Sequence, residues 1–192
     1  MESSKYNIRD FKGRNRRLLL EWQKIEQMCL QHDEIEVKAI ALNSDNLPLE
    51  YEVSYHIKSI CGIENESNLN IPGIKNTPLF GNFFKMRIEL PHKFPAIDGA
   101  PKFRFIDKDH QGNQMPTPWH PNIRFFGPMK GYVCLNRTDT YTDIADSILR
   151  ISEYLHYNLY HAVLTPPFPE DLKVAEWIRK QAEPNGWLDF KD

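Results

Sequence analysis

One cysteine and one short polar turn are the residues of this chain whose types and spacing are best suited to chemistry. The cysteine lies in Gly131-Tyr132-Val133-Cys134-Leu135, and the turn in Pro118-Trp119-His120-Pro121-Asn122-Ile123. Both fall between residues 107 and 139, where no helix or strand period is visible, and so long an irregular stretch in a compact domain is often functional. A cysteine thiolate is a nucleophile, and an asparagine side chain is an uncharged hydrogen-bond donor.

Each of these residues also has a structural interpretation. Cys134 fits a buried strand residue, since small thiols are often buried. Asn122 fits a turn residue that bonds its own backbone. His120 fits a residue that braces the turn better than one that moves protons, and Pro121 fixes the backbone.

The composition excludes several classes of protein. The 192 residues carry 24 Lys and Arg against 26 Asp and Glu, a formal net charge of −2 that gives no attraction to phosphate backbones, so no nucleic-acid partner is expected. With 41% hydrophobic residues the chain can form a core, and its length suits one domain over residues 1–192. No window approaches eighteen uncharged apolar residues, and the polar start is unlike a secretory signal, so we expect a cytoplasmic protein without a membrane partner.

Cysteine number and spacing argue against disulfides and zinc. The three cysteines are Cys29, Cys61 and Cys134. An odd, widely spaced set without a C-x-x-C pair predicts reduced thiols and no zinc site. Asp109, His110 and His120 could form a metal site only with a fourth ligand that the sequence does not supply.

Hydrophobic periodicity predicts the elements that must position the turn and the cysteine. Residues 14 to 31 have helical spacing, and residues 34 to 42 and 49 to 61 alternate as the strands of an antiparallel hairpin. A long connection over residues 62 to 78 follows. Strands are then predicted at residues 83 to 90 and 102 to 106.

Helical spacing returns after the irregular stretch. Residues 141 to 159 predict a helix that starts near Thr142 and Asp143, and a last helix runs from Glu170 and Asp171 to about residue 181. Strands that are grouped, and do not alternate with helices, indicate an α+β fold with a four-stranded antiparallel meander sheet.

The turn and the cysteine together resemble a known active site. His120-Pro121-Asn122-Ile123, followed by Gly131 and by Val133-Cys134-Leu135, is similar to the active-site sequence of the ubiquitin-conjugating enzyme family. The resemblance covers residues 14 to about 182, including a similar first helix at residues 16 to 28. It implies a ubiquitin-conjugating-enzyme-like fold with a long active-site loop.

The chain also departs from the family pattern. The gap from Asn122 to Cys134 is longer, with residues 125–129 inserted, and the stretch from Phe94 to Pro101 is expanded. Residues 136–141 lack the family's apolar and acidic run. These departures indicate a divergent member, and such sequences occur in bacterial ubiquitin-like conjugation operons as well as in eukaryotes.

The resemblance implies the roles of particular residues. Cys134 would carry the modifier as a thioester, Asn122 would steady the oxyanion or brace the loop, and His120 would support the turn. The partners would be ubiquitin or a ubiquitin-like modifier, an activating enzyme, a target protein and, in some systems, a ligase. No cofactor is implied, because ATP is consumed by the activating enzyme.

Five further residues are predicted to contact partners, each with a structural alternative. They are Arg16, Arg17, Phe94, Phe125 and Phe126. The two arginines would face an activating enzyme or ligase, or simply solvent. Phe94 would be an exposed ligase contact or a core residue, and the adjacent Phe125 and Phe126 would cover the cysteine or contact a partner.

Two other functions remain open at the level of sequence. A non-catalytic relative would keep the fold and bind ubiquitin or a peptide, although such relatives generally lack the cysteine. A thiol hydrolase would pair Cys134 with His156 or His161, but no hydrolase signature surrounds Cys134.

Overall fold

The fold combines an N-terminal helix, a four-stranded antiparallel sheet and C-terminal helices, which confirms the predicted α+β class. The structure is a computed structural model that describes residues 2–69, 71–109, 112–135 and 143–190. The larger sheet contains, in spatial order, β1 (Ile35–Leu42), β2 (Pro48–Tyr55), β5 (Phe84–Glu89) and β6 (Lys102–Phe105). A separate two-stranded sheet contains β3 (Ser59–Ile63) and β4 (Pro78–Gly81).

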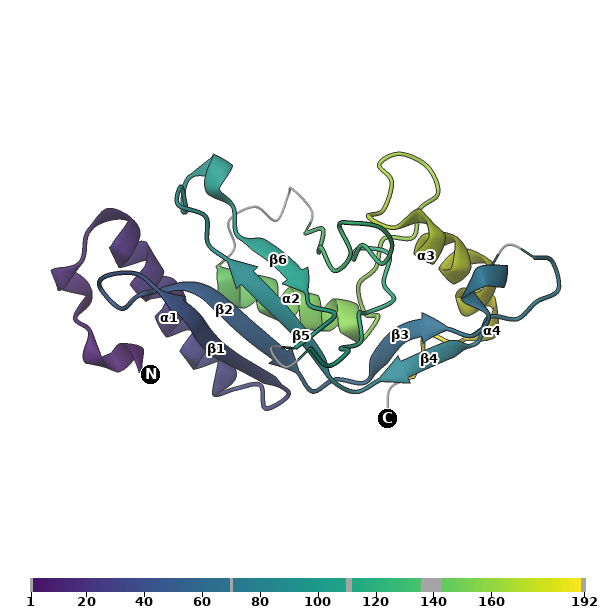
Figure 1. The fold of residues 1–192 in the computed structure, drawn as a ribbon, viewed down its shortest axis with the longest axis horizontal. Helices are drawn as coiled ribbons and strands as arrows, with labels where there is room; N and C mark the ends of the chain where they lie inside the picture. Colours follow the sequence, from purple (N-terminus) through teal and green to yellow (C-terminus); the bar gives the residue numbers. More distant parts are fainter. Residues whose placement is uncertain (1, 70, 110–111, 136–142, 191–192) are drawn as a thin grey trace.

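The helices are divided between the two ends of the molecule (Figure 1). They are α1 (Gly13–Cys29), α2 (Ile144–Leu155), α3 (Leu172–Trp177), a π-helical segment (Ile178–Ala182) and α4 (Glu183–Asn185). Short 3-10 turns lie at Ser3–Lys5, Ile8–Asp10, Glu66–Asn68 and Ile97–Gly99. Figure 1 shows α1, α2 and the larger sheet toward one end, and β3, β4, α3 and α4 toward the other.

The larger sheet buries one face because apolar and charged residues alternate along its strands. In β5, Phe84, Met86 and Ile88 are fully buried, whereas Arg87 and Glu89 are exposed. These buried side chains join those of α1 and α2 in one cluster, here called the sheet core. Its members include Leu18, Trp22, Ile25, Val53, Tyr55, Phe84, Met86, Ile88, Phe105, Ile148 and Ile151.

The prediction of one strand over residues 49 to 61 is wrong in one respect, because the segment forms two strands, β2 and β3, in two different sheets. β5 begins at Phe84, opposite Tyr55, so β2 has no partner on the β5 side beyond that point. The chain leaves the larger sheet, and β3 pairs with β4, which begins at the last residue of the predicted connection and continues through residues for which no element was predicted. The four predicted strands therefore form the sheet as expected, with a hairpin inserted in the meander.

The helix predicted over residues 141 to 159 is shorter than expected. It begins at Ile144 and ends at Leu155, and Leu159 is 42% exposed. Tyr157 has a positive φ of 57°, which ends the helical path. Thr142, the expected start, lies outside the described residues.

A second hydrophobic cluster, here called the C-terminal core, gathers residues from short and irregular segments. Its members are Ile60, Ile63, Trp119, Tyr157, Ala162, Val174, Ala175, Trp177, Ile178 and Ala182. Trp177 donates its indole N–H to the Asn76 carbonyl at 2.9 Å, which holds α3 against the hairpin segment. The predicted turn is therefore joined to this second core through Trp119.

Candidate active site

The structure brings the cysteine and the polar turn together through the backbone. The N–H of Cys134 donates to the carbonyl of Asn122 at 2.8 Å, and Ile123 pairs with Val133 in an antiparallel bridge. The N–H of Arg124 donates to the Tyr132 carbonyl at 2.9 Å. The longer gap is thus closed as a hairpin-like loop, so the insertion extends away from Cys134 without separating it from the turn.

Gly131 anchors this loop to the edge of the larger sheet. The N–H of Phe105, in β6, donates to the Gly131 carbonyl at 2.8 Å, and Gly131 has a φ of +87°. A Cβ at this position would lie 2.0 Å from the Phe105 carbonyl oxygen. Only glycine allows this close approach, which sets the path of the chain into Cys134.

Cys134 is a free, half-buried thiol. Burial raises its pKa above the ordinary value, and the nearby Glu170 carboxylate raises it further. The thiol is therefore mostly protonated at neutral pH, unlike a cysteine activated by an adjacent cation.

His120 is a buried brace in this geometry. Its Nδ1 accepts from the Asn122 N–H at 3.2 Å, so the proton sits on Nε2, which donates to the Leu159 carbonyl at 3.1 Å. The ring stacks on Tyr154 with a centroid distance of 4.9 Å. Burial lowers the pKa of His120 to about 3, so the ring stays neutral near pH 7.

The side chain of Asn122 also supports the surrounding backbone. It is 4% exposed, and its Oδ1 accepts from the His161 N–H at 2.9 Å. Its Nδ2 has no hydrogen-bond partner within the part of the chain that the structure describes. Asn122 thus braces a distant segment, and its Nδ2 remains available as a donor.

Two acidic residues complete the site and were predicted only as charges in the first turn of a helix. The N–H of Asp171 donates to the Pro121 carbonyl at 2.9 Å, and its Oδ1 accepts from two backbone N–H groups at the start of α3. Its Oδ2 accepts from the Phe125 N–H at 3.0 Å. Glu170 forms an ion pair with Arg124 at 2.9 Å. A single sequence gives no signal for the contacts of Asp171 with Phe125 and of Glu170 with Arg124, because each joins residues 46 positions apart.

Phe125 and Phe126 are half-buried against Trp119, at centroid distances of 4.6 and 5.6 Å. Lys130 lies 5.0 Å from the Phe125 ring, and Lys173 lies 4.5 Å from the Phe126 ring. The two phenylalanines therefore anchor the inserted loop on the C-terminal core, and their outer side carries two cations.

Phe94 is placed differently from the predicted partner contact. Its side chain is 4% exposed and belongs to the sheet core. The proline-rich turn after β5 folds back, with the Phe94 N–H donating to the Pro91 carbonyl at 2.9 Å. The exposed-contact prediction is therefore wrong, and the alternative of core packing describes this residue.

The two arginines of α1 differ in their surroundings. Arg16 is exposed, whereas Arg17 is held by Glu21 and, at 3.3 Å, by Asp143. Glu21 also accepts the Ile144 N–H at 2.8 Å, which ties α1 to the start of α2. Arg17 therefore has an internal role that the sequence pattern did not reveal.

Several alternative sites find no support in the described residues. Those residues contain no group of three or more His, Cys, Asp or Glu side chains arranged to hold a metal ion, and His110 lies outside them. Both ring nitrogens of His120 are hydrogen-bonded, and His161 Nε2 lies 2.8 Å from the Pro167 carbonyl. None of the helices in the described ranges is long and apolar enough to span a membrane.

Comparisons with known proteins give similarity at the level of the solved structures alone. No family model matches the chain, and no curated protein matches its sequence. An E2 domain of a ubiquitin-conjugating enzyme from Toxoplasma gondii aligns over 88% of this chain and 88% of its own, with 21% identity and a TM-score of 0.47. Human ubiquitin-conjugating enzyme E2 G1 aligns over 71% of this chain and 92% of its own, with 18% identity and a TM-score of 0.41. Neither comparison identifies a catalytic residue in this chain.

Proposed function

We propose that this chain is a conjugating enzyme for ubiquitin or a ubiquitin-like modifier, with Cys134 as the carrier. The observation that carries the proposal is the 2.8 Å hydrogen bond from the Cys134 N–H to the Asn122 carbonyl. It joins, across the inserted loop, the two segments whose sequences resemble the family's active site. The pathway is a bacterial or eukaryotic ubiquitin-like system in the cytoplasm.

The first step is transthiolation. The Cys134 thiolate attacks the carbonyl carbon of the modifier's thioester on the activating enzyme, a new C–S bond forms, and the old C–S bond breaks to release that enzyme's thiolate. The raised pKa of Cys134 reduces the thiolate fraction. Because the acyl group arrives already activated, the step does not need a strongly acidic thiol.

The second step is aminolysis by a lysine of the target protein. The neutral amine attacks the thioester carbonyl, and collapse of the tetrahedral intermediate forms an amide and releases the Cys134 thiolate, which takes up a proton. The free Nδ2 of Asn122 is the candidate donor to the oxyanion, and a well-placed donor of this kind contributes about 3 kcal/mol.

Glu170 is the candidate group that orients the acceptor amine. Its carboxylate is close enough to raise the pKa of the Cys134 thiol. It would attract an incoming ammonium group, while the ion pair with Arg124 limits how far Glu170 raises the acceptor's pKa. His120 has no assigned part in proton transfer, because both of its ring nitrogens are occupied.

The partners follow from this reaction. The exposed Arg16 on α1 is the candidate contact for an activating enzyme or ligase. Arg17 supports that surface through its ion pairs with Glu21 and Asp143. The protein itself would need no cofactor, since the activating enzyme uses the ATP.

A charging assay tests this function. The chain is mixed with its cognate modifier, activating enzyme and ATP, and the products are separated with and without reductant. We expect a reductant-sensitive adduct that is absent from Cys134→Ala. If the cognate system forms no adduct, the conjugating-enzyme proposal fails and a non-catalytic binding module becomes the better account.

A further inference from the structure

Exposed apolar side chains gather in one segment next to the candidate active site. Residues 159–172, here called the strap, form most of the connection between α2 and α3 and include the first residue of α3. The strap contains six of the twelve large hydrophobic residues that are exposed within the described ranges. They are Leu159, Tyr160, Val163, Leu164, Phe168 and Leu172, with exposed fractions between 38% and 55%.

The strap begins and ends at the polar turn. Near its start, the His161 N–H donates to Asn122 Oδ1 at 2.9 Å. Near its end, the Asp171 N–H donates to the Pro121 carbonyl at 2.9 Å. Neighbouring residues of the turn hold both His161 and Asp171, so the chain between them, with the exposed Val163, Leu164 and Phe168, forms an arch. Cys134 is bonded to the same turn at the base of this arch.

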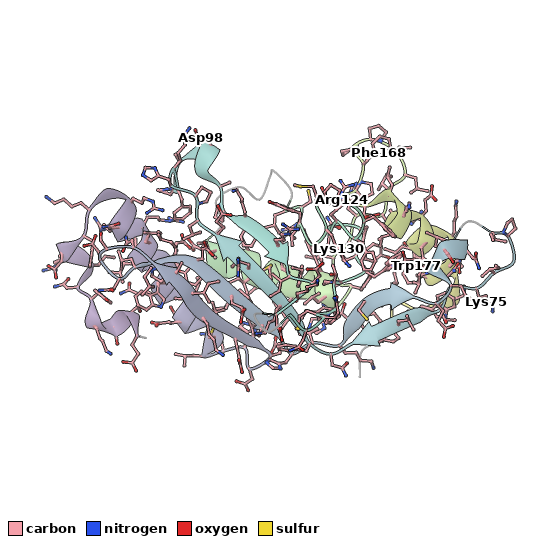
Figure 2. All side chains as sticks on the ribbon, viewed as in Figure 1. Lys75, Asp98, Arg124, Lys130, Phe168 and Trp177 are labelled. Atoms are coloured by element: carbon pink, nitrogen blue, oxygen red, sulfur yellow. The ribbon has the colours of Figure 1, made fainter. Side chains whose placement is uncertain are left out.

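Two lysines border the strap. Lys130 and Lys173 lie over the rings of Phe125 and Phe126, and those rings are 5.2 Å apart. Three acids also lie at the strap, and each is engaged. Glu170 pairs with Arg124, and Asp171 is 4% exposed and binds backbone N–H groups. Glu183 accepts from the Tyr160 hydroxyl and pairs with Arg179. Figure 2 shows Phe168 at the upper edge of the molecule, with Arg124 and then Lys130 below it toward the middle.

An apolar surface with a cationic border is complementary to an acidic, apolar peptide. Exposed apolar patches bordered by polar groups mark interaction sites. Complementary charge at such a border sets specificity and the rate of association more than it sets affinity. Both ends of the strap are bonded to the polar turn, and Cys134 is bonded to the same turn. A peptide that lies along the strap would therefore have side chains within reach of Cys134.

We propose, on the basis of the proposed function, that the strap together with Lys130 and Lys173 binds the part of the target protein that surrounds the acceptor lysine. The favoured segment has apolar side chains that cover Val163, Leu164 and Phe168, and glutamate or aspartate side chains that face the two lysines. The chain would therefore select acceptor lysines in acidic, apolar surroundings.

Peptide binding to the protein without an attached modifier tests this inference. The probe is a 13-residue peptide with a central lysine flanked by leucine and glutamate, compared with the same peptide carrying glutamine in place of glutamate. NMR titration of the 15N-labelled chain should show shifts in the amides of the strap. We expect the glutamate peptide to bind roughly three- to tenfold more tightly, the effect of one or two exposed ion pairs.

Matched variants separate charge from apolar contact. Lys130→Glu combined with Lys173→Glu should abolish or reverse the preference for glutamate. Lys75→Glu, at the right-hand tip of the molecule in Figure 2 and apart from Lys130, should not change it. Phe168→Ser should weaken both peptides, and Leu79→Ser, with a similarly exposed side chain on β4, should weaken neither.

Equal affinity for the two peptides, shifts outside the strap, or a preference unchanged by the double charge reversal would each overturn the inference. The result does not depend on thioester formation, because binding is measured on the chain without an attached modifier. Failure of the charging assay would instead count against the proposed function.

Discussion

The sheet core and the C-terminal core are built in different ways, and the candidate active site lies between them. The sheet core joins long elements whose apolar residues repeat at helix or strand spacing. The C-terminal core joins a short hairpin, a tryptophan from an irregular segment and a short helix, largely through aromatic contacts. His120 stacks on Tyr154 of α2 and also contacts Tyr157 of the C-terminal core.

The difference indicates which region controls the site. The hydrogen bonds of Pro121 and Asn122 to Asp171 and His161 are made to segments that flank the C-terminal core. The larger sheet reaches Cys134 through Gly131 and Val133, which bond to β6. We therefore expect large-to-small substitutions in the C-terminal core to disturb the turn and the strap. Such substitutions in the sheet core should lower the stability of the whole fold without a particular effect on the turn and the strap.

Replacing one tryptophan in each core gives the largest expected effect. Trp119→Ala and Trp22→Ala each remove a buried indole and should each lower the free energy of unfolding by about 3–5 kcal/mol. Only Trp119→Ala removes the support of Phe125 and Phe126, so it should also speed hydrogen exchange at His161 and Asp171. Urea unfolding and amide exchange measure the two effects. Equal exchange at these amides in both variants would show that the cores do not differ in this way.

Two glycines of the active-site loop separate backbone strain from steric clash. Gly127 and Gly131 both have a positive φ, so alanine should cost about 1–2 kcal/mol at either position. At Gly131 the new Cβ would also meet the Phe105 carbonyl oxygen at 2.0 Å, whereas at Gly127 it would meet nothing within 4 Å. Gly131→Ala should therefore cost about 1–3 kcal/mol more in urea unfolding. A smaller loss than in Gly127→Ala would contradict the tight junction with β6.

His120 predicts a pH dependence of stability. Its pKa falls from the ordinary value of 6.5 to about 3 in the folded chain, so the unfolded chain binds the extra proton first on acidification. Stability contributed by this group is present above pH 6.5 and is lost as the pH falls from there toward 3, with a slope of up to ~1.4 kcal/mol per pH unit. Unfolding in urea at pH 7, 6 and 5 measures the slope.

His120→Gln is the control for this slope. Glutamine can accept from the Asn122 N–H and donate to the Leu159 carbonyl, but it does not titrate. The variant should show a smaller loss of stability between pH 6.5 and 5. An unchanged slope would mean that His120 is not the buried neutral group described here.

Glu170 gives the smallest expected effect. Glu170→Gln removes the carboxylate that raises the pKa of Cys134 and releases Arg124 from its ion pair, so the thiolate fraction should rise. Alkylation of Cys134 by iodoacetamide near pH 7.5 should become roughly two- to threefold faster. Cys61, whose pKa is raised by burial without a carboxylate contribution, serves as the internal control. A slower reaction at Cys134 would contradict the assignment of Glu170 as its neighbour.

The regular half of the fold could be predicted from the sequence because its signals are local. The stripe of Leu18, Trp22 and Ile25 is buried in α1, and the alternation around Met86 places β5. The division of the predicted second strand could not be foreseen, because alternation continues to Ile57 while the change of sheet depends on where β5 begins. Local periodicity indicates whether a segment is a helix or a strand. Which strand it pairs with depends on residues elsewhere in the chain.

The site was predictable only in part for the same reason. The closeness of Cys134 to the turn follows the resemblance in sequence. The contacts of His161, Glu170 and Asp171 with that turn join distant segments, so no local pattern reports them. Phe94 was misassigned because a phenylalanine between prolines has the same local pattern whether it is exposed or packed in a core.

The measurement that tests the central claim most directly is the mass of the modifier adduct in single-cysteine and serine variants. In a Cys29→Ser, Cys61→Ser background, Cys134 should still form a reductant-sensitive thioester when modifier, activating enzyme and ATP are supplied. Cys134→Ser in the same background should give an adduct of nearly the same mass that resists reductant, because an oxygen ester replaces the thioester. Loss of the adduct in the single-cysteine variant, or a reductant-sensitive adduct that survives Cys134→Ala in the otherwise native chain, would contradict the assignment of Cys134 as the carrier.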